Sequence, residues 1–130
     1  MKEKKLKKVL KNLPTISPCP IAFTVKIIGG KWKPGILWEL TKHKSLRFGQ
    51  LAKLLPEVAP KMLTQNLREL EKHSIVNRKV YAEVPPRVEY SLTKLGKSLY
   101  PILYEISIWG IENNTEIDES EILFSKKTEF

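Results

Sequence analysis

The chain has 130 residues, 42% hydrophobic, 28% charged and 8% aromatic, which suits one folded domain and is too short for two separate cores. Its 23 Lys and Arg against 14 Asp and Glu give a net charge of +9, which favours polyanionic partners, nucleic acid ahead of an anionic membrane surface. A single cysteine excludes an intramolecular disulfide and a multi-cysteine zinc site. No stretch is apolar enough to span a membrane, and the basic start lacks a signal-peptide cleavage site, so we expect a cytoplasmic protein.

Charge is unevenly distributed along the chain. Residues 111–130 hold six acids and two lysines, a net charge of −4, which leaves +13 for residues 1–110. We therefore expect a basic N-terminal segment at 1–17, a folded body at 18–113 and an acidic tail at 114–130. The first segment fits a short basic amphipathic helix up to Pro14, or equally well a flexible arm; its apolar residues at helical spacing are Leu6, Val9, Leu10 and Leu13.

Two short helices are predicted next. Prolines make residues 14–20 a helix-free entry, and Gly29-Gly30 ends the helix that follows. Its apolar stripe is Ile21, Val25 and Ile28. Pro34 stands near the start of a second helix that ends around residues 42–44, with an apolar face of Trp32, Ile36, Leu37 and Leu40.

The rest of the body predicts a helix-turn-helix, a hairpin and a long last helix. One helix runs from Phe48 to Pro56 and the next opens at Pro60, with Leu63, Leu67 and Leu70 on one face. Alternating apolar residues on either side of Pro85-Pro86 predict a two-stranded ribbon. Thr93 is a suitable N-cap for the last helix, and we expect Pro101 to kink it. Its stripe is Leu95, Leu99, Ile102, Leu103, Ile106 and Trp109.

This order of elements is the winged-helix arrangement, a mostly α fold with a small β-hairpin (α+β). Three segments, CPIAFTVKIIGGKWKPGILWEL, LRFGQLAKLLPEVAPKMLTQNLRELE and VPPRVEYSLTKLGKSL, resemble the HxlR-type winged helix-turn-helix regulators of the MarR-like group, over roughly residues 18–110. The resemblance implies a homodimeric, non-enzymatic DNA-binding transcription factor that needs no cofactor and dimerises through its terminal helices. Two features depart from the family: Val58-Ala59 precede the second helix without a capping serine, and Ser74 stands where many relatives place glycine.

The second helix of the motif carries the predicted reading face. If its leucines face the core, the helical period turns Lys61, Thr64, Gln65 and Arg68 outward together. Arginine and lysine bind guanine, glutamine binds adenine with two hydrogen bonds, and threonine binds a base or a phosphate. The alternative is a merely solvated polar face. Asn66 is expected to point elsewhere.

Three further basic residues are candidates for DNA contact. Arg87 follows the two prolines of the hairpin tip, where it is expected to reach a phosphate or the minor groove; the alternative is an ion pair with Glu83 or Glu89. Arg47 and Lys79 are expected to bind phosphates, which sets affinity without sequence preference.

Cys19 stands between Pro18 and Pro20, directly ahead of the first helix of the body. The positive end of that helix and nearby Lys26, Lys31 or Lys33 would favour the thiolate. The resemblance implies oxidant or electrophile sensing for some relatives, and with one cysteine the modification must be an adduct or a disulfide to another chain. A small packing residue is the alternative.

Other functions are weighed against these residues. An RNA- or ribosome-associated winged helix remains the alternative and would bind structured RNA more tightly than duplex DNA. A thiol-dependent enzyme lacks a base beside Cys19, and the sequence carries no metal motif. Trp32, Trp38 and Trp109 are expected in core or dimer packing rather than as stacking platforms for single strands. The partners are therefore duplex DNA and a second copy of the chain, with no membrane and an unknown effector.

Overall fold

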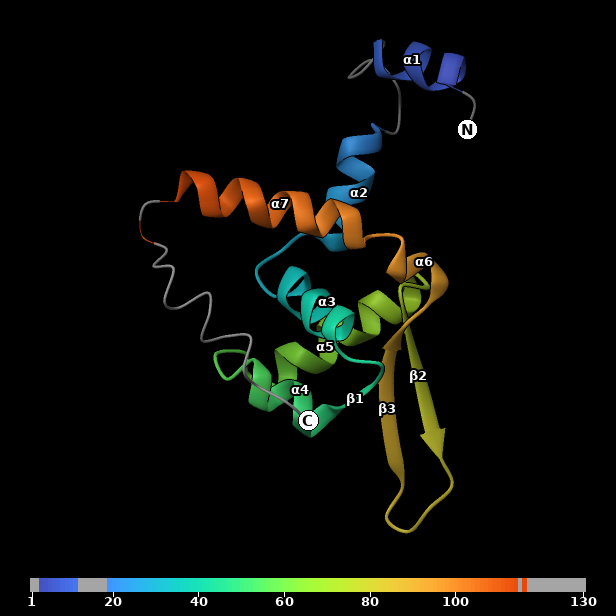
Figure 1. Cartoon of the computed structure of the whole chain (residues 1–130). Helices are drawn as coiled ribbons and strands as arrows, with labels where there is room; N and C mark the ends of the chain where they lie inside the picture. The colour runs from blue at the N-terminus through green and yellow to red at the C-terminus, as the bar shows by residue number, and fades with distance from the viewer. Residues whose placement is uncertain (1–2, 12–18, 115, 117–130) are drawn as a thin grey trace.

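The computed structural model describes residues 3–11, 19–114 and 116. Figure 1 shows a helical body from which a long hairpin projects. The elements in chain order are α1 (Glu3–Lys11), α2 (Pro20–Ile28), α3 (Lys33–Lys42), β1 (Leu46–Arg47), α4 (Phe48–Leu54), α5 (Pro60–Lys72), β2 (Val76–Tyr81), β3 (Arg87–Leu92), α6 (Lys94–Lys97) and α7 (Tyr100–Asn113). The mostly α winged-helix prediction is confirmed. The first segment is helical over α1, whereas its predicted extension to Leu13 and Pro14, and most of the acidic tail, lie outside the described residues.

The sheet has one strand more than the sequence predicts. β2 and β3 form the expected antiparallel hairpin, in which Val76 lies opposite Leu92 and Tyr81 opposite Arg87. The two-residue strand β1 adds to the other side of β3, which gives the order β1-β3-β2. Because β1 directly precedes α4, this pairing ties the start of the helix-turn-helix to the wing.

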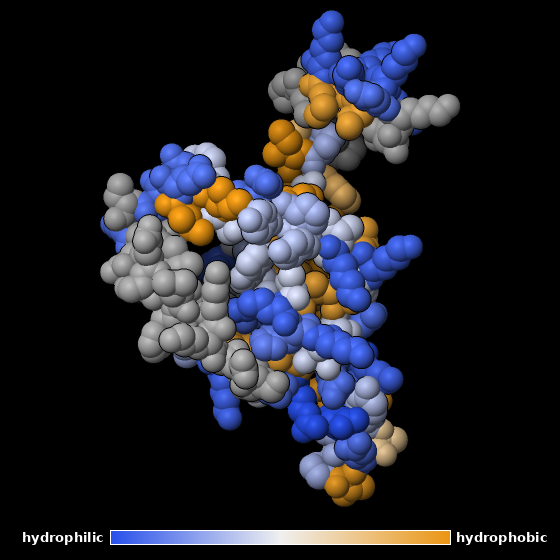
Figure 2. Space-filling view, in the orientation of Figure 1, coloured by the Kyte–Doolittle hydropathy of each residue, from blue (hydrophilic) through white to orange (hydrophobic). Residues whose placement is uncertain are grey.

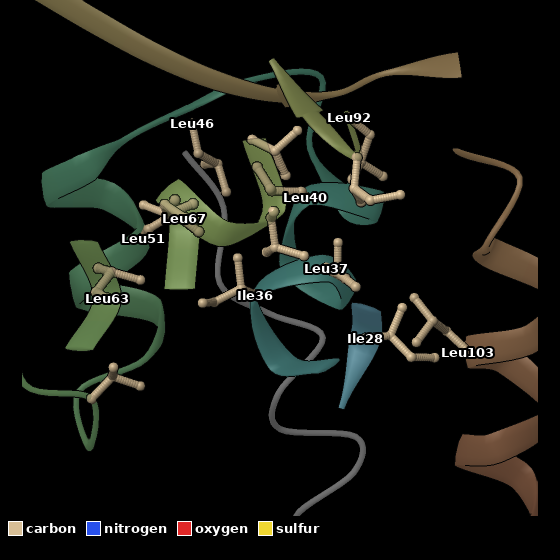
Figure 3. Close-up of a cluster of buried hydrophobic side chains, with 14 residues drawn as sticks. Ile28, Ile36, Leu37, Leu40, Leu46, Leu51, Leu63, Leu67, Leu92 and Leu103 are labelled. Carbon is tan, nitrogen blue, oxygen red and sulfur yellow. The ribbon is translucent and has the colours of Figure 1, made fainter. Parts of the chain in front are cut away.

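A single core gathers buried side chains from α2, α3, α4, α5, α7 and the three strands. The predicted inner face of α5 is confirmed, since Leu63, Leu67 and Leu70 are at most 1% exposed. Figure 3 shows Leu67 of α5 beside Leu51 of α4, with Ile28 of α2 and Leu103 of α7 facing one another at one edge. The whole buried cluster is Ile28, Ile36, Leu37, Leu40, Leu46, Leu51, Val58, Leu63, Leu67, Leu70, Ile75, Val76, Leu92 and Leu103.

The two departures from the family pattern lie at the two ends of α5. Ala59 is the N-cap residue, it gives no side-chain hydrogen bond, and Pro60 begins the helix. Beyond the other end, Ser74 has a φ of 60°, a left-handed conformation that costs a residue with a Cβ about 1–2 kcal/mol. Its N–H donates to the Glu71 carbonyl at 2.9 Å, and the Ile75 N–H donates to the Leu70 carbonyl at 2.9 Å. The turn therefore satisfies the last carbonyls of α5 and leads directly into β2.

The last helix corrects the sequence prediction. Thr93 is an N-cap as predicted, but of the short α6, with Oγ1 accepting from the Gly96 N–H at 2.9 Å. Pro101, however, does not kink one long helix: the chain forms the short α6 and then restarts as α7, with the proline in its first turn. Proline has no N–H to continue the ladder of α6, whereas that N–H is not needed in the first turn of a new helix.

α7 is held on α3 by aromatic packing. The rings of Trp38 and Tyr100 stack with centroids 5.9 Å apart and an interplanar angle of 8°. Leu103, one turn along α7, is buried in the common core. Trp32 and Trp38 both pack against that core as predicted, and the outer residues of α7 remain exposed.

Candidate nucleic-acid interface

The outward face of α5 carries the four predicted reading residues together. Lys61, Gln65 and Arg68 are exposed and Thr64 is half-buried. The four line one open groove of about 370 Å³. Thr64 Oγ1 donates to the Pro60 carbonyl at 3.0 Å. Asn66 points away as predicted: it is buried, and its Nδ2 donates to the Met62 carbonyl at 2.7 Å.

A second groove joins this helix to the wing. It has a volume of about 390 Å³ and is lined by Thr64, Leu67, Arg68, Glu71, Arg78 and Tyr90. Arg78 is exposed and was not among the predicted residues. Arg78 could have been predicted from the short link between α5 and β2, because such a link makes the first residues of β2 run beside the helix. Arg68 lines both grooves, so the basic surface continues from α5 onto the hairpin.

Arg87 is placed differently from the outward orientation predicted for it. Its guanidinium lies 4.0 Å from the centroid of the Tyr81 ring, and its side chain is 28% exposed. Nη2 lies 3.4 Å from Glu83 Oε1, and Nε lies 3.5 Å from Glu89 Oε1. The alternative ion pair is therefore the one seen, because two carboxylates and a cross-strand aromatic ring hold the cation against the hairpin.

The other two predicted phosphate contacts are exposed. Lys79 Nζ lies 4.8 Å from the Tyr81 ring centroid on β2. Arg47 precedes α4, and its backbone N–H donates to Gln50 Oε1 at 2.9 Å, which fixes the start of that helix. Arg47 lines a third groove, of about 420 Å³, with residues 83–88 of the hairpin tip. The pairing of β1 with β3 thus places Arg47, at the start of the helix-turn-helix, beside the hairpin tip.

One ion pair connects α5 to α3. Lys33 Nζ lies 2.5 Å from Glu69 Oε2, and the lysine side chain is 9% exposed against 43% for the glutamate. The hydrogen bond and charge of Lys33 lower the pKa of Glu69 below its ordinary value, and a side-chain hydrogen bond from Gln65 lowers it further. No local pattern predicts this pair, because Lys33 and Glu69 are far apart along the chain.

Cys19 occupies the N-cap position of α2 and is half-buried. Its carbonyl accepts from the Phe23 N–H at 2.9 Å. Two of the lysines expected near the sulfur make other contacts: Lys31 lies over the Trp32 ring at 4.8 Å, and Lys33 pairs with Glu69. α2 and the hairpin lie at opposite ends of the body (Figure 1).

Apolar side chains are exposed on α2 and α7. Figure 2 shows hydrophobic side chains on the outside of both helices, while hydrophilic ones dominate along the hairpin. Trp109 is 69% exposed and Phe23 58%. We give the name α2–α7 apolar face to the exposed apolar residues of these two helices, which are Ile21, Phe23, Val25, Ile102, Ile106, Trp109 and Ile111.

Comparison with known proteins identifies the family. The family model described as HxlR-like helix-turn-helix matches residues 27–118. The chain belongs to this family. It is 45% identical over 103 residues to the uncharacterised HTH-type transcriptional regulator YdeP of Bacillus subtilis (strain 168), covering 79% of this chain and 80% of that protein. This HxlR-like protein is accordingly an HTH-type transcriptional regulator, and regulators of this family bind DNA.

Solved structures of related regulators share the fold. The redox regulator HypR in its oxidised form has a TM-score of 0.69 and 44% identity, over 74% of this chain and 98% of that chain. The reduced form of the transcriptional regulator YodB from B. subtilis has a TM-score of 0.67 and 31% identity, over 77% and 98%. The HxlR-like fold of this chain is therefore one that redox-responsive regulators also use.

Two negative findings concern the described part of this HxlR-like protein. Within residues 3–11, 19–114 and 116, no helix is long and apolar enough to cross a membrane. Over the same ranges, no three His, Cys, Asp or Glu side chains gather as a metal site would require.

Proposed function

We propose that this protein is a sequence-specific regulator that binds duplex DNA as a homodimer at an inverted-repeat operator. The observation that carries the proposal is the joint presentation of Lys61, Thr64, Gln65 and Arg68 on the open side of α5. An α-helix of this kind fits the major groove, where these side-chain types distinguish bases.

Basic residues around α5 supply the sequence-independent part of binding. Arg78 lies beside Arg68, Lys79 is on the same strand, and Arg47 lies beside the hairpin tip. Such cations bind backbone phosphates and displace condensed counterions, so affinity falls steeply with salt. Arg87 contributes to DNA binding only if a phosphate replaces Glu83 or Glu89 as its partner.

The α2–α7 apolar face supports the homodimer. One recognition helix buries too little surface for high specificity, and a two-fold dimer doubles it. The exposed apolar side chains of α2 and α7 form a surface that a second copy would bury. The two recognition helices would then enter successive major grooves, with half-site centres about one helical turn, or a small multiple of it, apart.

Cys19 is the proposed control point of this dimer. It begins α2, so a change at its sulfur would act on the helix that carries part of the α2–α7 apolar face. Diamide would oxidise two Cys19 thiols of a dimer to a disulfide and take up both hydrogens as it is reduced to the hydrazine. A quinone would instead form a carbon–sulfur bond with one thiolate. HypR, described as a redox regulator, lends this step support by similarity.

Selection on random duplex DNA tests the function directly. We expect an inverted repeat to be enriched, and operator affinity to respond to diamide in the wild type and not in Cys19→Ser. Equal affinity for every duplex would refute sequence-specific binding. Tighter binding to a structured RNA competitor would favour the RNA-associated alternative, and an unchanged wild-type affinity after diamide would leave Cys19 as a packing residue.

A further inference from the structure

A buried lysine is anchored to the recognition helix. Lys33, in the first turn of α3, is 7% exposed, the lowest value for any charged residue in the described ranges. A buried ammonium is costly unless it is paired and hydrogen-bonded. Its Nζ lies 2.5 Å from Glu69 Oε2 of α5. The carboxylate of Glu69 is therefore held in place from outside its own helix.

The same carboxylate also binds a reading residue. Gln65 precedes Glu69 by four residues, so the two side chains lie one above the other on the helix. This spacing places the Gln65 amide within reach of the Glu69 carboxylate, and its contribution to the lowered pKa of Glu69 agrees with that placement. A chain of contacts thus runs from Lys33 through Glu69 to Gln65, which is exposed in the groove of the reading face.

The contacts from Lys33 through Glu69 to Gln65 affect how the glutamine amide can bind a base. The amide nitrogen has two hydrogens, and in the proposed arrangement one of them is directed at Glu69. The second hydrogen and Oε1 then remain for adenine, whose N7 accepts and whose N6 amino group donates. An amide fixed by one bond to the protein loses less rotational freedom when it binds the base.

We propose that Glu69, fixed by Lys33, is a positioning residue that orients Gln65 for adenine in the operator. The inference rests on the proposed function and deepens it, because it names a residue that sets specificity without touching DNA. Loss of the anchor leaves Gln65 on the face but lets its amide rotate among several orientations. Discrimination at one base pair then falls, while general affinity for DNA remains.

The test compares operators changed one base pair at a time. Gln65→Ala first identifies the adenine position, where wild-type discrimination should be about tenfold or more. The variant K33M/E69L replaces both members of the ion pair with apolar groups and so avoids leaving a buried charge unpaired. We expect the discrimination of this variant at that position to fall at least about threefold. Adding Gln65→Ala to it should lower discrimination there to the level of Gln65→Ala alone and no further, because both changes act through one side chain.

Two controls separate positioning from stability. Lys33→Arg keeps a cation opposite Glu69 and should retain discrimination. E3L/K7M removes the exposed Glu3–Lys7 ion pair of α1 by the same kinds of substitution and should leave discrimination at the adenine position unchanged. Circular dichroism and thermal unfolding establish that each variant is folded.

The contrary outcomes are distinct. A folded K33M/E69L protein with wild-type discrimination overturns the proposal, as does a uniform loss of affinity for every operator variant, which would indicate a structural role alone. If Gln65→Ala alters no base preference while the wild type still selects an operator, this inference fails and the proposed function stands. If the wild type prefers no duplex at all, the proposed function itself fails.

Discussion

Replacing Trp109 by alanine should dissociate the proposed homodimer. Trp109 is 69% exposed on α7, within the α2–α7 apolar face. An aromatic residue of its class buries about 150–250 Å², so roughly 100–170 Å² of this side chain is available to a second copy. At about 25 cal/mol per Å², its burial stabilises a dimer by roughly 2–4 kcal/mol per protomer. Two tryptophans are lost per dimer and 1.4 kcal/mol is a factor of ten, so we expect the dimer dissociation constant to rise at least about 500-fold.

Sedimentation equilibrium over a range of concentrations measures this change, and an operator titration reports its consequence. The Trp109→Ala protein should bind an isolated half-site like the wild-type monomer and lose the extra affinity of the full inverted repeat. Val80→Ala is the matched control, because Val80 is also an exposed apolar residue, at 53%, but lies on the hairpin. A wild-type dimer that Trp109→Ala leaves intact, or that Val80→Ala weakens equally, would refute the assignment of this face.

Three further predictions concern the DNA surface and the ends of α5. Arg78→Ala should weaken binding to all duplexes alike and reduce the slope of log affinity against log salt by about 0.9 per bound protomer. Lys26→Ala on α2 should leave that slope unchanged in a fluorescence anisotropy titration. Because the pKa of Glu69 is lowered, its ion pair stabilises the fold fully above the ordinary glutamate value of about 4.3 and loses that contribution as the pH falls through the lowered pKa. The difference in unfolding free energy between wild type and Glu69→Gln, measured in urea, should therefore be constant above about pH 5 and shrink below about pH 4; a constant difference down to acid would contradict the pairing. Ser74→Gly should raise the unfolding free energy by up to about 1 kcal/mol, since glycine relieves the left-handed strain while adding freedom to the unfolded chain; a destabilised variant would show that the serine side chain compensates.

Local patterns explain what the sequence could predict. The spacing of Leu63, Leu67 and Leu70 defines both the buried face of α5 and the outward face opposite it, because the helical period allows no other arrangement. Thr93 is recognisable as a cap because its hydroxyl can meet the orphan N–H groups of the next turn. These elements depend on neighbours within a few residues of each other.

Long-range pairings explain what the sequence could not predict. The strand of Leu46–Arg47 is too short to show a period and exists because β3 lies beside it. Arg87 turns back onto the hairpin because Tyr81 faces it across the strand pair. The pairing of Lys33 with Glu69 joins two helices, and each residue alone resembles an ordinary surface charge.

The stack of Trp38 on Tyr100 separates two properties of the operator. In the proposed homodimer, the reading face of α5 would decide which bases are bound, and the packing of α7 on α3 would decide how far apart the two copies of α5 are held. The two sets of residues do not overlap, so the sequence of a half-site and the length of the spacer between half-sites would be encoded independently. A change of ring size at Trp38 or Tyr100 would therefore alter the preferred spacer while the half-site stays the same, and a duplicated regulator could acquire new targets without any change in its recognition helix.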